Sequence, residues 1–297
     1  MVDRTVNVSG YPHTPFANRG VLTAAHGPAR FIDLAKTLAL SLELHSPHVP
    51  RAIVTDSDDP ELIKLFDVIV EYRPEFGPGH FQKSVLDLYT PFNETFFIES
   101  DSLCTRDIDT LWALFQSVPF GVSGQRTELG HSVSIKPSTF QDLELDSLPA
   151  VTGGLVYFRR GPDSDLIFQQ CRKIMDHYEE LPLDLVPTGA TDEVAFSLAV
   201  AMHGLPAIDD NWASLAAPNG DQERLCIDVL GGKTNIVRDG KCIQPAVVHF
   251  SGKWINGSEY RRERLMLDLV VRKRWPKPIA ALIAKGMSIV PAIPSEG

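Results

Sequence analysis

The sequence lacks several features that would place it in a particular class of protein. It has no run of about 18 apolar residues, so no membrane-spanning helix is expected. The residues after Met1 lack the apolar stretch of a secretory signal peptide. The four cysteines form no CxxC pair and match no zinc-module spacing, so we expect reduced thiols and a cytoplasmic location.

Internal repeats, low-complexity tracts and an obvious linker are also absent. The 297 residues, of which 43% are hydrophobic and 22% charged, can bury a sizeable core and do not have the composition of a disordered chain. We therefore expect a polar N-terminal lead-in at residues 1–19, one domain at residues 20–255 and a helical tail at residues 256–297.

The net charge of −10 lacks the basic surplus typical of nucleic-acid-binding proteins, so we expect no nucleic-acid partner. From Lys253 onward, however, nine Lys and Arg residues stand against four Asp and Glu residues, mixed with apolar ones. Such a basic amphipathic tail is typical of peripheral contact with an anionic membrane surface, here the inner face. Packing of the tail against the domain is the alternative.

Short apolar segments alternate with helical patterns through the first third of the chain. This alternation predicts an α/β fold, with a mostly parallel central sheet flanked by helices. In such sheets, ligands bind beyond the carboxyl ends of the strands. The expected strands are 21–25, 51–55, 68–71 and 95–98, and the expected helices are 30–45, 61–66 and 80–89.

The strongest chemical signal follows the fourth of these strands, where Glu99 and Asp101 stand two residues apart. Side chains at positions i and i+2 of an extended chain point the same way, so the two carboxylates repel each other unless a cation lies between them. Oxygen ligands favour Mg²⁺, Mn²⁺ or Ca²⁺ over zinc. An acidic turn after a buried strand is the alternative.

A late apolar strand at 247–250 carries the second signal. His249 lies near its end as a candidate third metal ligand, and an imidazole beside two carboxylates shifts the expected ion from Mg²⁺ toward Mn²⁺. Gly252 would let the backbone approach a ligand closely, and Lys253 is a point charge suited to phosphate. A core histidine followed by a glycine turn is the alternative.

Three weaker signals accompany these two. Asp192 and Glu193 open a predicted helix, where acids also suit the helix dipole without any functional role. Lys83 precedes the acidic pair on a predicted helix, either to reach a phosphate or as a solvated lysine. Gly153 and Gly154 predict either a flexible approach before a strand or a simple turn.

The order of these motifs resembles that of glycosyltransferases of GT-A fold, especially the retaining family 8 group that includes glycogenin and bacterial galactosyltransferases. The resemblance covers roughly residues 20–255 and includes a basic residue about 16 positions before a D-x-D motif. The chain departs from the family pattern in four places: Glu99 replaces Asp, Thr152 replaces Asn, Glu193 replaces Gln, and Lys253 comes two positions early in a shortened His-x-x-Gly-x-x-Lys-Pro-Trp motif.

The resemblance implies metal-dependent transfer of a sugar from a nucleotide-diphosphate donor, a UDP-sugar by analogy, with retention of anomeric configuration. The acceptor would be a hydroxyl of a saccharide, lipid or small molecule. By the same resemblance, Mn²⁺ or Mg²⁺ is held by Glu99, Asp101 and His249, while Asp192 and Glu193 are catalytic. The donor would contact Thr23, Ala24, Ala25, Asp56, Lys83, Ser100, Gly153, Gly154, Gly252 and Lys253.

Two other functions stay open on the sequence alone. A sugar-phosphate nucleotidyltransferase usually has a Gly-rich loop with Arg and Lys directly after its first strand, which residues 25–30 match poorly. A non-catalytic nucleotide-sugar-binding or scaffold protein that kept the fold would fit Glu99 and the shortened histidine motif.

Overall fold

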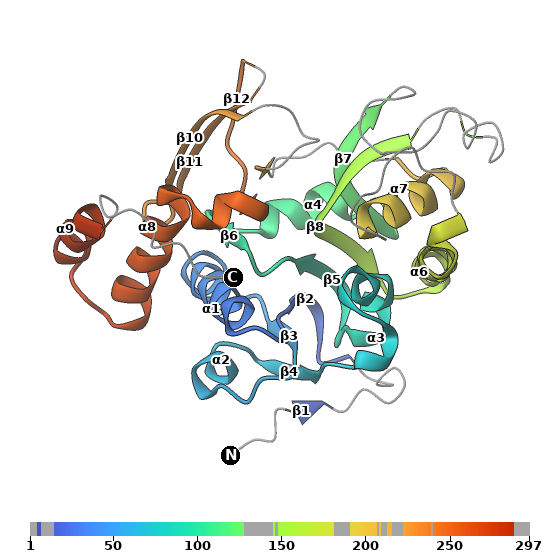
Figure 1. Ribbon diagram of the computed structural model, residues 1–297, viewed down its shortest axis with the longest axis horizontal. Helices are drawn as coiled ribbons and strands as arrows, with labels where there is room; N and C mark the ends of the chain where they lie inside the picture. The colour runs from blue at the N-terminus through green and yellow to red at the C-terminus, as the bar shows by residue number, and fades with distance from the viewer. Residues whose placement is uncertain are drawn as a thin grey trace.

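A seven-stranded sheet lies at the centre of the computed structural model, which describes residues 5–6, 15–127, 145, 148–180, 191–206, 208, 213–215, 222–238 and 240–287 (Figure 1). The first five strands in the order run parallel, and the last two run antiparallel to their neighbours. The predicted mostly parallel sheet is therefore confirmed. In sheet order the strands are β1 (Thr5–Val6), β4 (Val68–Glu71), β3 (Arg51–Thr55), β2 (Ala17–Ala24), β5 (Phe92–Ile98), β8 (Leu148–Arg159) and β7 (Phe120–Thr127).

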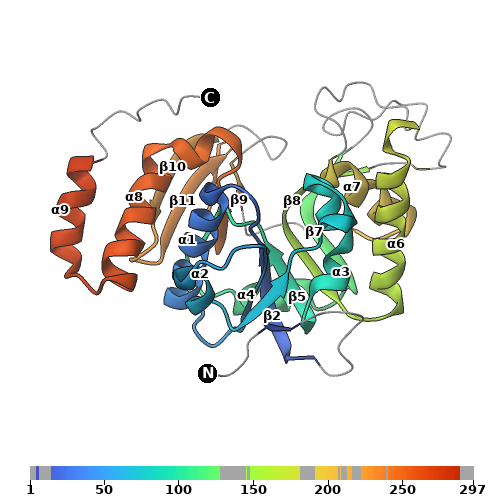
Figure 2. The same cartoon turned by 60° about the horizontal axis from the view of Figure 1, so that its bottom comes forward.

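Helices cover both faces of this sheet (Figure 2). Successive strand residues point to opposite faces, so Val21 and Phe96 pack on one side while Leu22 and Phe97 pack on the other. On the first side lie α1 (Ala29–His45), α2 (Pro60–Lys64) and α4 (Asp109–Phe115). On the second side lie the 3-10 helix η2 (Gly79–Val85), α3 (Leu86–Tyr89), α6 (Pro162–Asp176) and α7 (Asp192–Met202).

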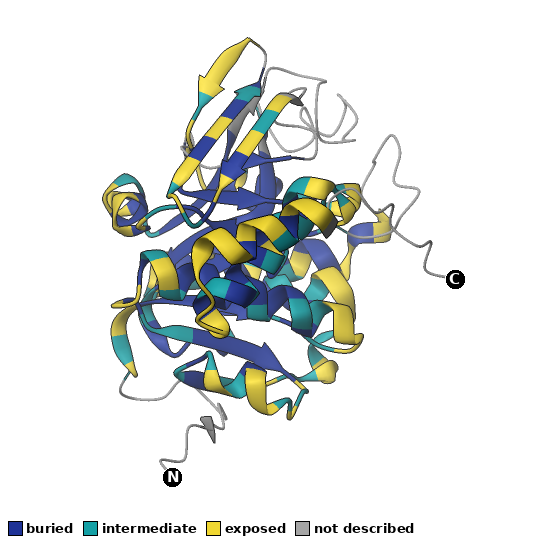
Figure 3. Ribbon diagram, turned by 90° about the vertical axis from the view of Figure 1, so that its left-hand side faces the viewer, coloured by how far each residue is buried: buried dark blue, intermediate teal, exposed yellow. Residues whose placement is uncertain are grey.

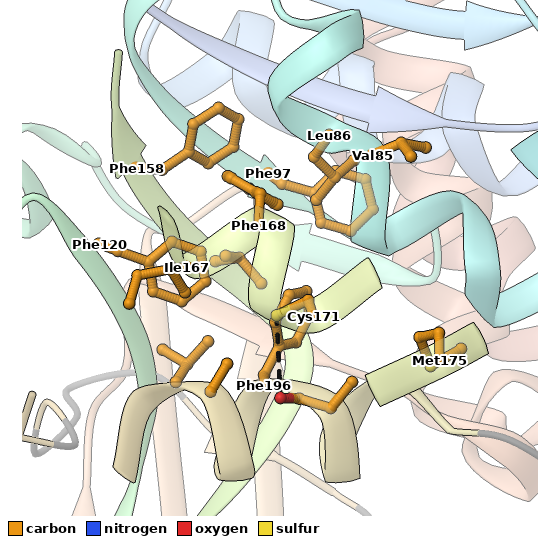
Figure 4. Close-up of a cluster of buried hydrophobic side chains, with 14 of the residues drawn as sticks. Val85, Leu86, Phe97, Phe120, Phe158, Ile167, Phe168, Cys171, Met175 and Phe196 are labelled. Carbon is orange, nitrogen blue, oxygen red and sulfur yellow. Dashed lines mark hydrogen bonds between the residues drawn. The ribbon is translucent and has the colours of Figure 1, made fainter. Parts of the chain in front are cut away.

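An aromatic cluster fixes α6 and α7 on the second side of the sheet (Figure 4). The ring of Phe168 lies 4.9 Å from that of Phe158 and 5.3 Å from that of Phe120, both edge-on. The thiol of Cys171 on α6 contacts the carbonyl oxygen of Ala195 on α7 at 3.8 Å. Burial of these large rings stabilises the packing of α6 and α7 on the sheet.

A second, three-stranded sheet in the order β6-β13-β9 brings the late part of the chain to the end of β5. Its strands are β6 (Ser102–Cys104), β13 (Val247–His249) and β9 (Ala213–Ser214). His249 pairs with Ser102, and the amide of Phe250 donates to the carbonyl of Asp101 at 2.9 Å. The backbone ladder therefore places His249 beside the acidic pair, although about 150 residues separate them in the sequence.

A third sheet consists of β10 (Gln222–Asp228), β11 (Lys233–Arg238) and β12 (Lys241–Ile243), all antiparallel. Buried and exposed residues alternate along β11, as the strands at the top of Figure 3 show. Ile227 and Ile236 point inward and pack with Phe250 and Tyr260. The sheet is thus covered on one face only.

The 3-10 helix η4 (Gly252–Asn256) leads into the predicted tail, which contains α8 (Ser258–Leu267), the π-helical turn η5 (Asp268–Arg272) and α9 (Lys277–Met287). Tyr260 and Leu267 of α8 are buried in the core, and α9 packs on α8 through Ala280 and Ala284. Leu282 of α9 is 75% exposed. Within the described residues, no helix is long and apolar enough to cross a membrane.

Three of the predictions that differ from the structure concern elements close to the cleft or to the start of the sheet. The segment 80–89 is not one helix, because η2 precedes α3 and glycines with positive φ, Gly77 and Gly79, distort its start. Residues 17–19 belong to β2 rather than to the lead-in, of which the structure otherwise describes only residues 5–6 and 15–16. Gly153 and Gly154 lie inside β8 and not in an approach or turn before a strand.

Candidate functional site

A cleft of about 550 Å³ opens at the carboxyl end of the parallel strands. Ala24 and Ala25 line it at the end of β2, Glu99 and Asp101 line it after β5, and Gly252 lines it from η4. Seven of the predicted residues therefore line one cleft at this edge of the sheet, namely Ala24, Ala25, Lys83, Glu99, Ser100, Asp101 and Gly252. The other lining residues are His26, Arg30, Phe31, Leu34, Val54, Tyr72, Gly79, His80, Gln82, Leu86, Tyr89, Phe97, Ile255 and Asn256.

Glu99, Asp101 and His249 form a group with the composition of a metal site. His249 Nε2 lies 2.9 Å from Glu99 Oε2 and 3.0 Å from Asp101 Oδ1, and one ligand atom of each lies within 4.8 Å of the others. Two carboxylate oxygens and one imidazole nitrogen are a donor set that could hold a divalent cation. Burial lowers the pKa of His249, but the charges of Glu99 and Asp101 outweigh burial and raise it to about 10. The local field thus favours positive charge at this point.

The other ring nitrogen of His249, Nδ1, also has neighbours that fix the ring. Ser214 Oγ lies 3.4 Å from Nδ1, and the Arg238 guanidinium donates to the carbonyl of Ser214 at 2.5 Å. A Cβ on Gly154 would lie only 2.4 Å from Nδ1, so glycine at this strand position makes room for the ring. These contacts direct Nε2 toward the carboxylates, as partners behind a metal-binding histidine usually do.

A second ionic group lies beside the first. Lys83 forms ion pairs with Glu99 and with Asp192, at 2.8 Å for the latter. His80 Nδ1 lies 2.6 Å from the other oxygen of Asp192, whose side chain is 3% exposed. Burial raises the pKa of Asp192, yet the charge of Lys83 and the hydrogen bond from His80 lower it overall. Asp192 is therefore an anion in a fixed orientation.

Gly153 makes this orientation sterically allowed, because a Cβ there would lie 1.8 Å from Asp192 Oδ2 and 2.9 Å from Lys83 Nζ. The sequence analysis predicted Gly153 and Gly154 to make the backbone flexible. In the structure, their missing Cβ atoms instead leave room for the side chains of Asp192 and His249. Glu193 follows in the first turn of α7, where burial and the charge of Asp192 raise its pKa to about 7.

The remaining residues predicted to contact the donor differ in whether they line the cleft. Thr23 is fully buried within β2, and Asp56 accepts hydrogen bonds from the amide of Gly27 at 3.1 and 3.3 Å. Ser100 lines the cleft. Lys253 does not line it and has its ammonium 5.8 Å from the centre of the Trp254 ring.

Among the cleft residues that were not predicted from the sequence, four bear on the chemistry of the site. His80 and Arg30 are isolated residues in segments without a motif. His26 and Tyr72 stack with ring centres 4.0 Å apart, but they come from separate strand ends, so only the folded chain brings them together. The adjacency of β2, β3 and β4 in a parallel sheet is the signal that would have suggested this pair.

No protein-family model matches the chain, and no curated protein matches it. Among solved structures, the chain is similar to the galactosyltransferase LgtC in complex with donor and acceptor sugar analogs, with a TM-score of 0.52 and 12% identity over 92% of this chain and 97% of that chain. An active-site mutant of LgtC gives a TM-score of 0.50 and 12% identity, over 78% of this chain and 87% of that chain.

The similarity to the glycosyltransferase GlyE of Streptococcus pneumoniae TIGR4 is weaker, with a TM-score of 0.43 and 16% identity over 61% of this chain. The chain spans 43% of the length of GlyE in that comparison. The similarity to LgtC, together with the mostly parallel sheet flanked by helices, shows that the chain has the predicted GT-A fold. At 12% identity this similarity establishes the fold and leaves the reaction to be argued from the site.

Proposed function

We propose that the protein is a metal-dependent glycosyltransferase that moves a sugar from a nucleotide-diphosphate donor to a hydroxyl acceptor. The observation that carries this proposal is the meeting of Glu99, Asp101 and His249 with the Lys83–Asp192 pair at one edge of the sheet. The first group suits a divalent cation, and the second suits a neighbouring polar ligand such as a sugar. The fold shared with LgtC, which was crystallised with donor and acceptor sugar analogs, supports this combination.

Glu99, Asp101 and His249 would hold Mn²⁺, or Mg²⁺ as the alternative. When bound, the cation would act as a Lewis acid toward the diphosphate and neutralise charge on the leaving group. Glu99 and Asp101 differ in their surroundings, since Glu99 is also paired with Lys83. Asp101 is therefore the ligand with fewer competing protein contacts.

Asp192 would bind sugar hydroxyl groups, because its ionised carboxylate accepts hydrogen bonds and its position is fixed by Lys83 and His80. Glu193, with a pKa of about 7, is available as either an acid or a base near neutral pH. Ala24 and Ala25 line the cleft at the strand end, next to His26, whose ring stacks on that of Tyr72, and this part of the cleft would hold the nucleobase. Retention of configuration and uridine as the nucleoside are part of the proposal by resemblance.

The main alternative is a non-catalytic nucleotide-sugar-binding or scaffold protein of the same fold. The ion pairs among Lys83, Glu99 and His249 favour it, because they already satisfy part of the site without a ligand. Catalysis requires that a bound donor and cation replace some of these contacts.

Release of nucleoside diphosphate from a panel of nucleotide-sugars, with Mn²⁺ and with EDTA, tests the proposal. We expect Mn²⁺-dependent release from at least one donor, and its loss in Asp101→Asn. Asp109→Asn is a matched control, because Asp109 belongs to an exposed group with His48 and Asp107 outside the cleft. If the wild-type protein binds UDP with Mn²⁺ but releases no nucleoside diphosphate from any nucleotide-sugar, the non-catalytic alternative is supported.

We further propose a cytoplasmic protein whose tail contacts an anionic membrane surface at the inner face. Ala280 and Ala284 pack inward on the protein, and the exposed apolar side chains of Ile279 and Leu282 support the proposed membrane contact. Flotation with phosphatidylserine vesicles at low salt should decrease in the double variant Ile279→Ser, Leu282→Ser. Equal flotation of the variant and the wild type would contradict the membrane contact.

A further inference from the structure

The cleft needs positive charge from the protein, because a bound diphosphate brings negative charge next to two carboxylates. Among the described residues, the basic side chains that line it are His26, Arg30, His80 and Lys83. Lys83 is paired with both Glu99 and Asp192, and His80 is bonded to Asp192. Two of the four basic groups thus neutralise the protein's own acids.

His26 and Lys253 are two further candidates for positive charge beside the diphosphate, but neither brings a charge to the cleft. His26 is stacked on Tyr72, and burial lowers its pKa, so its ring is neutral at neutral pH. Lys253, the predicted phosphate ligand, lies outside the cleft lining against Trp254. In its place, the nearby lining residues of η4 are Ile255 and Asn256, which carry no charge.

Arg30, by contrast, is a charged side chain that lines the cleft. Its guanidinium carbon lies 4.8 Å from the centre of the Phe31 ring, and no carboxylate within the described part of the chain pairs with it. It belongs to the first turn of α1, a 17-residue helix whose first turn contains no acidic residue and whose start has no side-chain cap. The exposed amide groups of this helix end add to the positive potential around Arg30.

We propose that Arg30 is the residue that binds the diphosphate of the donor in this protein. The inference rests on the proposed function. A guanidinium presents two parallel N–H groups to two phosphate oxygens, which a lysine ammonium does not. Arg30 lines the same cleft as Glu99 and Asp101, which His249 contacts at 2.9 and 3.0 Å, so a diphosphate between Arg30 and this cation group would be neutralised from both.

Calorimetric titration with pyrophosphate in the presence of Mn²⁺ tests this role without depending on the nucleobase. Arg30→Gln should weaken binding of pyrophosphate and of UDP by about tenfold to a hundredfold, the effect of one lost charged hydrogen-bond pair. Arg30→Lys should lose part of this affinity, because it keeps the charge and loses the two-pronged contact. Binding of Mn²⁺ alone should be unchanged in both variants, which also shows that they are folded.

Lys233→Gln is the matched control, since Lys233 is an exposed cation on β11 that does not line the cleft. Equal pyrophosphate affinity in Arg30→Gln and the wild type would overturn the inference, as would a loss confined to Lys253→Gln. Failure of the wild type to bind Mn²⁺ together with any of UDP, GDP or ADP would instead overturn the proposed function. The two failures are therefore distinguishable.

Discussion

Gly153→Ala should disable the site while leaving the fold intact. The added Cβ would lie 1.8 Å from Asp192 Oδ2, whereas ordinary contact begins near 3.4 Å, so the carboxylate must move by about 1.6 Å. Asp192 cannot move freely, because Lys83 and His80 bond both of its oxygens and its side chain is 3% exposed. The substitution therefore breaks one of these contacts or shifts β8.

The expected effect on turnover exceeds that on stability. A misplacement of about 1 Å in a positioning group can reduce the rate about a hundredfold. Overpacking of a buried site costs about 1–3 kcal/mol of folding free energy. We therefore expect Gly153→Ala to release nucleoside diphosphate about a hundredfold more slowly than the wild type, with its Mn²⁺ affinity kept.

Gly121→Ala on β7 is the matched control. Its Cβ would lie 2.7 Å from a ring carbon of Phe115 and 3.2 Å from Ile208, far from any proposed ligand contact. This variant should lose a similar amount of stability in urea unfolding yet keep its specific rate. Wild-type turnover in Gly153→Ala, or an equal loss of rate in both variants, would show that Gly153 does not act by making room for Asp192.

Three further predictions follow from the same contacts. Burial, together with the charge of Asp192, raises the pKa of Glu193 from 4.5 to about 7. The folded state therefore holds a proton that the unfolded state releases, and stability falls as pH rises between these values. Urea unfolding of Glu193→Gln should show a flatter pH dependence and gain up to about 3 kcal/mol relative to the wild type above pH 7. A thiol reagent should modify only Cys226 and Cys242 in the folded protein, because burial raises the pKa of Cys104 to about 12 and also that of Cys171. Reaction of all four without denaturant would contradict the packing. His80→Gln should weaken binding of an active nucleotide-sugar about tenfold and leave binding of the free nucleoside diphosphate unchanged, as measured by competition, because His80 bonds the proposed sugar-binding carboxylate and not the cation group.

The parallel part of the sheet could be predicted from the sequence because its strands are buried on both faces. Continuous apolar runs such as 51–55 and 68–71 match β3 and β4 at both ends. The strands β10, β11 and β12 were not predicted, since they are covered on one face and carry polar residues on the other. The 3-10 segment η2 was assigned to a helix because its side-chain pattern resembles that of an α-helix over a short stretch.

In the candidate site, too, features that depend on neighbouring residues in the sequence could be predicted, and features that depend on contacts across the fold could not. Glu99 and Asp101 could be placed because a strand end is a local feature, and His249 because it also follows an apolar strand. The role of Gly153 and Gly154 depends on Asp192 and His249 approaching across the fold, which no local pattern contains. The orientation of Lys253 toward Trp254 and the position of the Arg30 guanidinium over the Phe31 ring likewise depend on the folded chain.

Electron paramagnetic resonance of Mn²⁺ binding, with and without UDP, shows whether Glu99, Asp101 and His249 hold a cation that assists nucleotide binding. We expect Mn²⁺ to bind at this group, to bind more tightly when UDP is present, and to be lost from it in both Asp101→Ala and His249→Ala. Mn²⁺ binding that is the same in these variants as in the wild type, or that does not respond to UDP, GDP or ADP, would contradict the proposed metal site.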